Sequence, residues 1–153
     1  MPLRTGDPLP GRPDGLPWRE GPAGPLVIYF YPRDFTSVCT RQACEFREVH
    51  DAFRRDYGAE LVGISRDSEE RHARFRAEHR LPFRLLSDRS GELSRRFGVT
   101  RFWGLLPIVK RVTFVADAAD RIRGVFHHEL DPSAHVRDVR SCLAGLDAPR
   151  RPA

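Results

Sequence analysis

A continuous apolar and aromatic run, Leu26 to Tyr31, is followed at once by Pro32 and then by a long helical pattern. An unbroken run of this kind suits a strand that is buried on both faces of a sheet. Apolar residues then recur at spacings of three and four, which predicts an amphipathic helix from about Ser37 to Tyr57. The core of this chain is therefore expected to start with a buried strand that leads directly into a helix.

Further strands and helices alternate after this helix. The patterns predict strands at Glu60 to Ser65, Phe83 to Leu86, Lys110 to Ala116 and Arg121 to His127, and helices at Asp67 to His79, Gly91 to Phe97 and from Asp131-Pro132 onward. Asp67 is the expected cap of its helix, with Glu70 as the capping-box partner. Crossover helices give parallel neighbours and a final hairpin gives an antiparallel pair, so we predict an α/β sandwich with a mixed sheet.

A length of 153 residues favours one domain with a single core. Residues 1–25 are rich in Pro and Gly and are expected to be an irregular lead-in of the same domain, with one short hairpin around Leu16 to Trp18. The domain proper is expected over residues 26–147, and residues 148–153 are expected to be a frayed tail.

The composition argues against a membrane or nucleic-acid role. No apolar run approaches the ~20 residues of a membrane-spanning helix. Residues 1–18 lack an apolar signal-peptide core, so a cytoplasmic protein is expected. The net charge is +5, but basic and acidic residues alternate, which is typical of solvated helix faces and not of a nucleic-acid site.

The chain has three cysteines, Cys39, Cys44 and Cys142. An odd number in a cytoplasmic setting argues against a permanent disulfide framework. Zinc would need about four ligands, commonly in short pairs, and the Cys39–Cys44 spacing is wider than C-x2-C and has no matching second pair. Redox chemistry is therefore the favoured role for the first two, while Cys142 is expected to be a half-buried filler of the last helix.

Cys39 stands where the buried strand ends and the first helix begins. Helix N-termini carry unpaired N–H groups and partial positive charge, so they stabilise a thiolate. On the helical wheel Cys39 lies near Phe46 and faces inward, whereas Cys44 lies well round the cylinder. A thiolate is a nucleophile, and a second cysteine nearby can capture its oxidised form.

The segment from Pro32 to Thr40 resembles the active-site motif of the peroxiredoxins, because it contains Pro32-x-x-x-Thr36-x-x-Cys39. Cys44, five residues after Cys39, is similar to the second cysteine of the bacterioferritin comigratory protein or peroxiredoxin Q branch. Other similar blocks are Gly63 to Ser68, Leu81 to Asp88 and Arg111 to Phe114. The resemblance covers about residues 26 to 146 and implies a thioredoxin-like three-layer sandwich.

The resemblance implies a thiol-dependent peroxidase that reduces hydrogen peroxide or organic hydroperoxides. Cys39 would be the peroxidatic cysteine and Cys44 the resolving cysteine, with recycling by thioredoxin or a similar dithiol reductant. A monomer is implied, with no nucleic-acid or membrane partner, and no metal, flavin or haem.

The resemblance also assigns roles to the neighbours of the two cysteines. Arg111 would favour the anion of Cys39, and Thr36 would offer its hydroxyl to the thiolate or to peroxide. Thr36 could also simply cap the helix, which is compatible with catalysis. Pro32 would shield the pocket, and the N–H groups of Val38 and Cys39 would donate to peroxide oxygens.

The spacing of Cys39 and Cys44 requires a conformational change, and Gln42 departs from the family pattern. Five residues of helix separate two Cα atoms by roughly 8–9 Å, whereas a disulfide tolerates at most about 7 Å. The start of the helix must therefore unwind before Cys39 and Cys44 can bond. Gln42 stands where the family usually has Glu; an amide can still accept a hydrogen bond from Arg111 but brings no charge.

Other interpretations remain open at this point. Cys44 could be a bystander, with Cys39 resolved by an external thiol. The chain could be a thioredoxin-fold dithiol redox sensor or binding module without peroxidase turnover, although such proteins favour C-x2-C. It could also be a non-catalytic interaction protein. The apolar residues Phe102, Trp103, Leu105 and Leu106 are expected to form either a contact surface or the mouth of the pocket.

Overall fold

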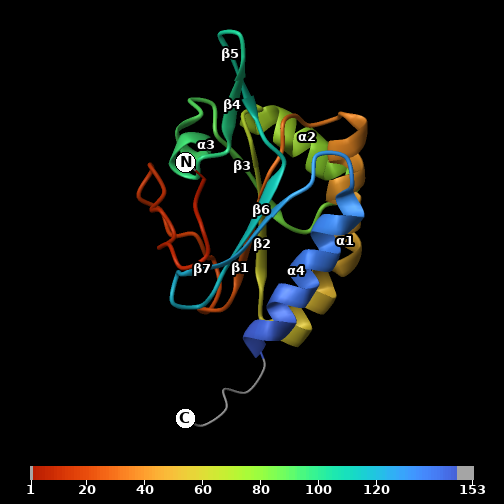
Figure 1. Ribbon diagram of the computed structural model, residues 1–153. Coiled ribbons are helices and arrows are strands. Elements are labelled where there is room, and N and C mark those ends of the chain that lie inside the picture. Colours follow the sequence, from red (N-terminus) through yellow and green to blue (C-terminus); the bar gives the residue numbers. More distant parts are fainter. Residues whose placement is uncertain (1, 148–153) are drawn as a thin grey trace.

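The computed structural model describes residues 2–147, which form a mixed five-stranded sheet between two covering layers (Figure 1). The strands are β1 (Leu26–Phe30), β2 (Glu60–Ser65), β3 (Arg84–Ser87), β6 (Val112–Ala116) and β7 (Ile122–His127), in the order β3-β2-β1-β6-β7. β1 pairs in parallel with β2 and antiparallel with β6, so β1 is central and both of its edges are satisfied.

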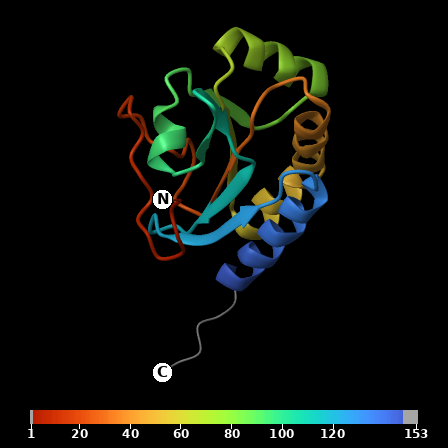
Figure 2. The same ribbon diagram turned by 45° about the horizontal axis from the view of Figure 1, so that its top comes forward.

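Helices cover the two faces unequally. The helices are α1 (Ser37–Tyr57), α2 (Glu69–His79), α3 (Glu92–Arg96) and α4 (Pro132–Asp147). Figures 1 and 2 show α1 and α4 side by side against one face of the sheet, while α3 and the N-terminal segment lie against the other. This arrangement confirms the predicted α/β class and the three layers.

The alternation of side chains along β1 supplies both cores. Val27, Tyr29 and Tyr31 point to the face covered by α1, α2 and α4, whereas Leu26, Ile28 and Phe30 point to the opposite face. All of these side chains are fully buried, which explains why the run consists of aliphatic and aromatic residues and contains no charged one. Trp18 from the lead-in packs into the second core, so the irregular first segment shares the core of the sheet.

Most predicted elements form at the expected places, and two local predictions are wrong. The predicted bounds of α1 and β2 are those observed. Asp67 does not cap α2: Ser68 is the N-cap, and its hydroxyl accepts from the N–H of Arg71. The short hairpin expected around Leu16 does not form, since residues 2–25 make only an isolated bridge between Pro8 and Arg121. The tail expected at 148–153 lies outside the described residues.

A small hairpin between α3 and β6 was not predicted. It consists of β4 (Thr100–Trp103) and β5 (Leu106–Val109) and projects beyond the sheet at the top of Figure 1. Its turn exposes 80% of Trp103 and 98% of Leu105. The apolar residues here therefore lie on the surface, as both predicted roles require. Within residues 2–147, every helix is too short or too polar to traverse a bilayer.

Candidate active site

Cys39 lies in the first turn of α1, immediately after the loop that leaves β1. Its side chain is 1% exposed. Thr36 is the N-cap residue but forms no side-chain cap, and the first turn carries no acidic residue. The bond from the N–H of Thr40 to the carbonyl of Thr36 is the first of the helix, so the N–H groups of Val38 and Cys39 precede it. The positive end of the helix therefore meets the sulfur without a competing carboxylate.

Arg111 reaches the same sulfur from the strand beside β1. The antiparallel register pairs Phe30 with Val112, so the end of β1 and the start of β6 lie together. From there, the Nη1 group of Arg111 donates to Sγ of Cys39 at 3.1 Å and to Oε1 of Gln42 at 2.9 Å. The sheet thus unites two predicted site residues that are 72 positions apart. It also confirms that the amide of Gln42 accepts from this arginine.

The charged groups around Arg111 determine which anion can pair with its buried guanidinium. The Arg111 side chain is 5% exposed, and no carboxylate in residues 2–147 forms an ion pair with it. Its other partners are the neutral Gln42 amide and the backbone carbonyl of Glu129, at 2.9 Å from Nε. A buried cation is costly unless it is paired. The thiolate of Cys39 is the anion that this geometry offers to it.

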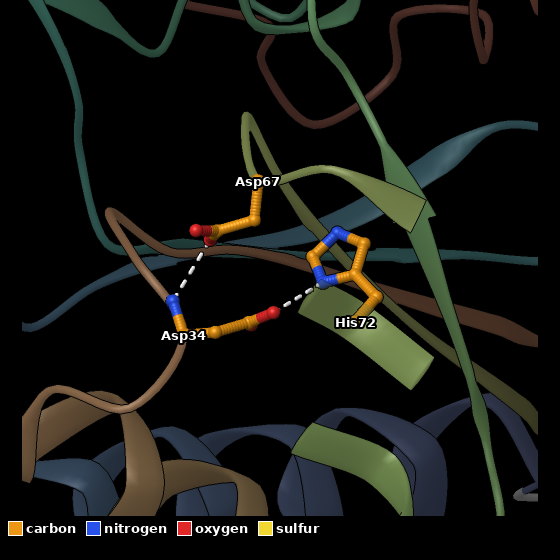
Figure 3. A group of neighbouring side chains, drawn as sticks. All are labelled: Asp34, Asp67 and His72. Atoms are coloured by element: carbon orange, nitrogen blue, oxygen red, sulfur yellow. Dashed lines mark hydrogen bonds and ion pairs between the residues drawn. The ribbon is translucent and has the colours of Figure 1, made fainter. Parts of the chain in front are cut away.

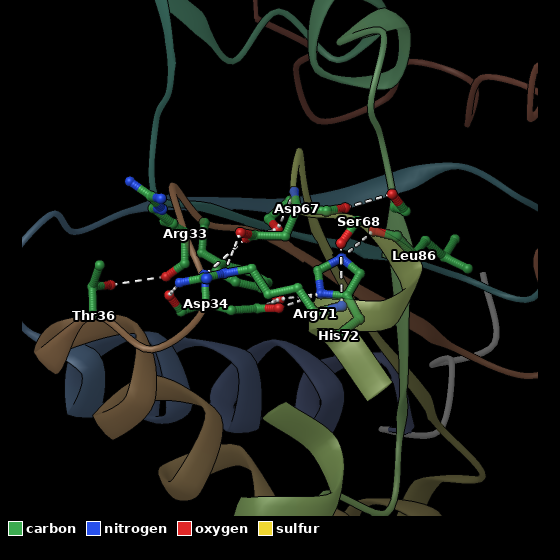
Figure 4. Close-up of polar contacts among 11 residues, drawn as sticks. Arg33, Asp34, Thr36, Asp67, Ser68, Arg71, His72 and Leu86 are labelled. Atoms are coloured by element: carbon green, nitrogen blue, oxygen red, sulfur yellow. Dashed lines mark hydrogen bonds and ion pairs between the residues drawn. The ribbon is translucent and has the colours of Figure 1, made fainter. Parts of the chain in front are cut away.

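Cys44 and Thr36 are two further predicted site residues, in α1 and at its N-cap. Cys44 is half-buried on the same unbroken helix, and all three cysteines are free. The hydroxyl of Thr36 is exposed and donates to the carbonyl of Arg33 at 2.8 Å, so it neither caps the helix nor touches the sulfur (Figure 4). Its catalytic role stays a prediction, whereas the expected position as the cap of the helix is confirmed, without a hydrogen bond from the side chain.

A groove of about 540 Å³ runs from Pro32 to the β4–β5 hairpin and is lined there by residues 106–109. Leu106 lines this groove, but Cys39, Phe102, Trp103 and Leu105 are not among its lining residues, so both roles expected for the apolar hairpin residues stay predictions. Pro32 and Val38 are both half-buried. Cys142 is half-buried and packs against the core shared by Val139 and Leu146, as predicted, and burial raises the pKa of its thiol.

A buried histidine supports the loop that holds Arg111. Nε2 of His135 donates to the carbonyl of His128 at 2.7 Å, and its Nδ1 therefore accepts from the hydroxyl of Thr113 at 2.8 Å. His128 precedes Glu129, whose carbonyl binds Arg111. The neutral ring is fully satisfied, and burial lowers the pKa of His135 from 6.5 to about 4.

Acid is therefore expected to destabilise this support between pH 6.5 and about 4. In this window the unfolded chain binds a proton at His135 that the folded chain excludes, so stability rises with pH. The contribution is complete above pH 6.5 and decreases by about 3 kcal/mol as pH falls through the folded pKa. Urea unfolding across this range should show the slope. His135→Gln, whose amide can still donate to His128, should flatten it; equal slopes in both proteins would contradict the assignment.

Sequence reasoning missed a polar cluster on the other side of the active-site loop (Figure 3). Asp34 is completely buried, and its carboxylate accepts from the Tyr31 hydroxyl at 2.5 Å and contacts Nδ1 of His72 at 2.6 Å. The N–H of Asp34 donates to the carboxylate of Asp67 at 2.8 Å. The position of Asp34 inside the Pro32–Cys39 motif was the available signal. Tyr31 directly follows β1, whereas His72 and Asp67 come from α2 and the loop before it.

Asp34, Asp67 and His72 are also chemically able to ligate a cation, since their donor atoms lie within 4.8 Å of one another. Each donor is already engaged, however, in the Asp34–His72 contact or in the ion pair of Asp67 with Nε of Arg71 at 2.9 Å. The arrangement is that of a completed hydrogen-bond network, which Figure 4 shows extending from Asp34 to Ser68 and Leu86.

The sequence and the fold of this chain are similar to those of known proteins. The model of the AhpC/TSA family matches residues 19–125, which include Cys39, Cys44 and Arg111. The chain belongs to the AhpC/TSA family. This peroxiredoxin is 39% identical over 137 residues to the chloroplastic peroxiredoxin Q of Sedum lineare, covering 89% of this chain and 71% of the relative. It is 38% identical over 123 residues to that of Populus jackii, covering 80% of this chain but only 56% of the relative.

Comparison with solved structures supports the same family. A crystal structure of peroxidoxin BcpB from Mycobacterium tuberculosis superposes with a TM-score of 0.82 at 32% identity, covering 95% of this chain and 99% of that one. The resemblance to the bacterioferritin comigratory protein or peroxiredoxin Q branch is thereby confirmed, and so is the thioredoxin-like peroxiredoxin fold. The plant relatives are chloroplastic proteins, and the cytoplasmic location expected for this chain stays a prediction.

Proposed function

We propose that this peroxiredoxin is a thiol-dependent peroxidase that uses Cys39 as its nucleophile and Cys44 as its resolving cysteine. The observation that carries the proposal is the buried guanidinium of Arg111, which lies 3.1 Å from the Cys39 sulfur and has no carboxylate partner in residues 2–147. Family membership supports the same activity and does not favour a dithiol sensor without turnover.

In the first step, the Cys39 thiolate attacks one oxygen of the peroxide and the O–O bond breaks. The sulfur becomes a sulfenic acid, and the other oxygen leaves as an alkoxide or hydroxide that takes up a proton. Arg111 and the N–H groups of Val38 and Cys39 are placed to stabilise negative charge as it moves from sulfur to oxygen. Hydrogen peroxide and organic hydroperoxides both supply the required bond.

In the second step, the Cys44 thiol displaces the sulfenic oxygen as water and forms a disulfide with Cys39. Both cysteines lie on the continuous helix α1, so their Cα atoms are too far apart for a disulfide in this conformation. We propose that the first turns of α1 unwind between the two steps. A structure of oxidised protein with the Cys39–Cys44 bond and an intact helix over residues 37–44 would refute this step.

In the third step, a dithiol reductant of the thioredoxin type attacks the disulfide, restores both thiols and leaves with its own disulfide. We propose a monomer as the working unit. The function is tested by mixing the reduced protein with one equivalent of peroxide and measuring free thiols and intact mass. Loss of two thiols, with one disulfide and no added oxygen at the end, is expected; unchanged thiols would refute peroxidase chemistry.

Cys44→Ser separates the first step from the second. The first turnover should persist, because Cys39, Arg111 and the helix N-terminus are untouched. The product should then be a stable sulfenic acid, seen as one added oxygen by intact-mass analysis, and turnover with thioredoxin should be lost or slowed about 10-fold or more. Cys142→Ser is the matched control, expected to form the disulfide normally. Full thioredoxin-linked turnover by Cys44→Ser would show that an external thiol resolves Cys39.

A further inference from the structure

Every polar atom of Asp34, in the loop between β1 and α1, has a partner, and two of these atoms bind residues of α2. Its N–H donates to Asp67, and its carbonyl accepts from Nη2 of Arg71 at 3.1 Å. One carboxylate oxygen accepts from the Tyr31 hydroxyl. The other contacts Nδ1 of His72 (Figure 3). Asp34 is completely buried and lies five residues before Cys39. A single residue of the active-site loop is therefore held by the helix that follows β2.

His72 can keep its bond to Asp34 only by holding a proton between them. Its Nε2 lies 3.1 Å from the carbonyl of Leu86, which can only accept, so Nε2 carries a hydrogen. Nδ1 then faces the Asp34 carboxyl oxygen at 2.6 Å, and one further proton must be shared by these two atoms. The ring of His72 is 2% exposed. The buried ring therefore links Asp34 of the active-site loop to Leu86 of β3 through its two nitrogen atoms.

The next residue of the loop, Phe35, has a backbone conformation that L residues rarely adopt. Its φ is 66°, in the left-handed region, which is unfavourable for a residue with a Cβ atom. Its ring packs edge-on against Phe75 of α2 with centroids 5.1 Å apart, and the guanidinium of Arg71 lies 5.0 Å above it. Contacts with α2 therefore maintain a strained residue just before the helix that carries Cys39.

We propose that Arg71, His72 and Phe75 form a clamp, the α2 clamp, that sets how fast Cys39 reaches Cys44 after oxidation. The proposal rests on the proposed function, because it concerns the step from sulfenic acid to disulfide. His72 is a positioning residue: it touches neither sulfur nor peroxide and acts through Asp34. While the clamp is closed, Phe35 stays left-handed and α1 begins at residue 37. When it opens, Phe35 relaxes and the first turns of α1 are released.

The clamp sets a balance between the conformation that reacts with peroxide and the conformation that closes the disulfide. A closed clamp keeps Cys39 beside Arg111 in the conformation that reacts with peroxide. It also prolongs the sulfenic acid, which a second peroxide can oxidise to the irreversible sulfinic acid. A weaker clamp should therefore close the disulfide faster and lower the fraction of sulfinic acid formed at high peroxide.

Two substitutions at His72 separate this role from a loss of stability. In His72→Gln the side-chain amide reaches the position of Nε2, so it keeps the bond to Leu86 and loses Asp34. In His72→Asn the amide reaches the position of Nδ1, so it keeps Asp34 and loses Leu86. Both remove the buried ring and should destabilise the fold similarly. The clamp predicts that only His72→Gln changes the partition between closure and overoxidation.

Rapid-quench mass analysis after a peroxide pulse measures sulfenic acid formation and disulfide closure as separate rates. His72→Gln should raise the closure rate about 10-fold relative to the parent, the size expected for loss of one hydrogen bond to a charged group. His72→Asn should stay within about twofold of the parent. Should His72→Gln fold poorly, Arg71→Gln, at a partly exposed position that contacts both the Asp34 carbonyl and the Phe35 ring, should accelerate closure in the same direction.

The two proposals fail in different ways. If the parent protein forms no sulfenic acid, the proposed function is wrong. If it forms the acid and closes the disulfide, but His72→Gln and Arg71→Gln close it at the parent rate, the α2 clamp is overturned. Equal acceleration by His72→Gln and His72→Asn would also overturn it, since general destabilisation would then explain the effect.

Discussion

Cys39→Ser is expected to abolish peroxide reduction and to leave the fold intact. The hydroxyl of serine is far less acidic than a thiol, so neither Arg111 nor the helix N-terminus can supply a nucleophilic anion at neutral pH. The substitution is nearly isosteric at a site that is 1% exposed, which limits the structural perturbation. Peroxide consumption should fall to the uncatalysed background, a loss of at least about 10⁴-fold.

The measurement is stopped-flow consumption of peroxide under single-turnover conditions, with urea unfolding to verify the fold. Cys142→Ser is the matched control, because Cys142 is also partly buried but packs on the far end of α4 against the core. It should consume peroxide at the parent rate. If Cys39→Ser still consumed peroxide as the parent does, another group would be the nucleophile and the proposed chemistry would be wrong.

Removing the charge of Arg111 is expected to have the second largest effect. Arg111→Met should lower the second-order rate constant with peroxide by about 10²–10³, the cost of losing one preorganised donor at a site of developing charge. Two contributions act together. The thiolate loses its buried counter-ion, and the departing oxygen loses a donor at the moment when charge reaches it.

Two controls identify the cause. Arg74→Met removes one positive charge from the exposed surface of α2 and should leave the rate unchanged, because exposed charges are screened. Arg111→Lys keeps the charge but loses the planar fork that contacts Cys39, Gln42 and the Glu129 carbonyl together, so its rate should be intermediate. A parent-like rate for Arg111→Met would mean that the helix N-terminus alone supports the anion.

Gln42 is a neutral partner of Arg111 at a position where the family usually has a glutamate. A glutamate at this position would place a carboxylate on Arg111, whereas the amide only orients it through Oε1 at 2.9 Å. The Nε2 group of Gln42 is buried and has no hydrogen-bond partner among the described residues. The positive charge of Arg111 is therefore directed to the Cys39 sulfur and is not shared with a second anion.

The sequence was sufficient for the elements that depend on local patterns. The apolar run of β1, the spacing of apolar residues in α1 and the Asp-Pro start of α4 are local signals, and the structure bears them out. The β4–β5 hairpin was missed because its two strands have only four residues each and show no alternation of buried and exposed positions. The cap of α2 was misplaced because Asp67 and Ser68 are both suitable residues, and only the tertiary contacts of Asp67 with Asp34 and Arg71 assign the cap to Ser68.

Residues 32–44 therefore indicated the chemistry of the active site and its position along the chain. They contain a thiol at the start of a helix, a second thiol five residues later and a motif shared with a known family. What the folded chain added is the environment of that thiol. The register of β1 with β6 brings Arg111 to Cys39, and α2 brings His72 to Asp34. The first contact was implied only by the family resemblance and the second had no signal in the sequence, because a pairing between distant segments depends on strand order and packing, which no local pattern encodes.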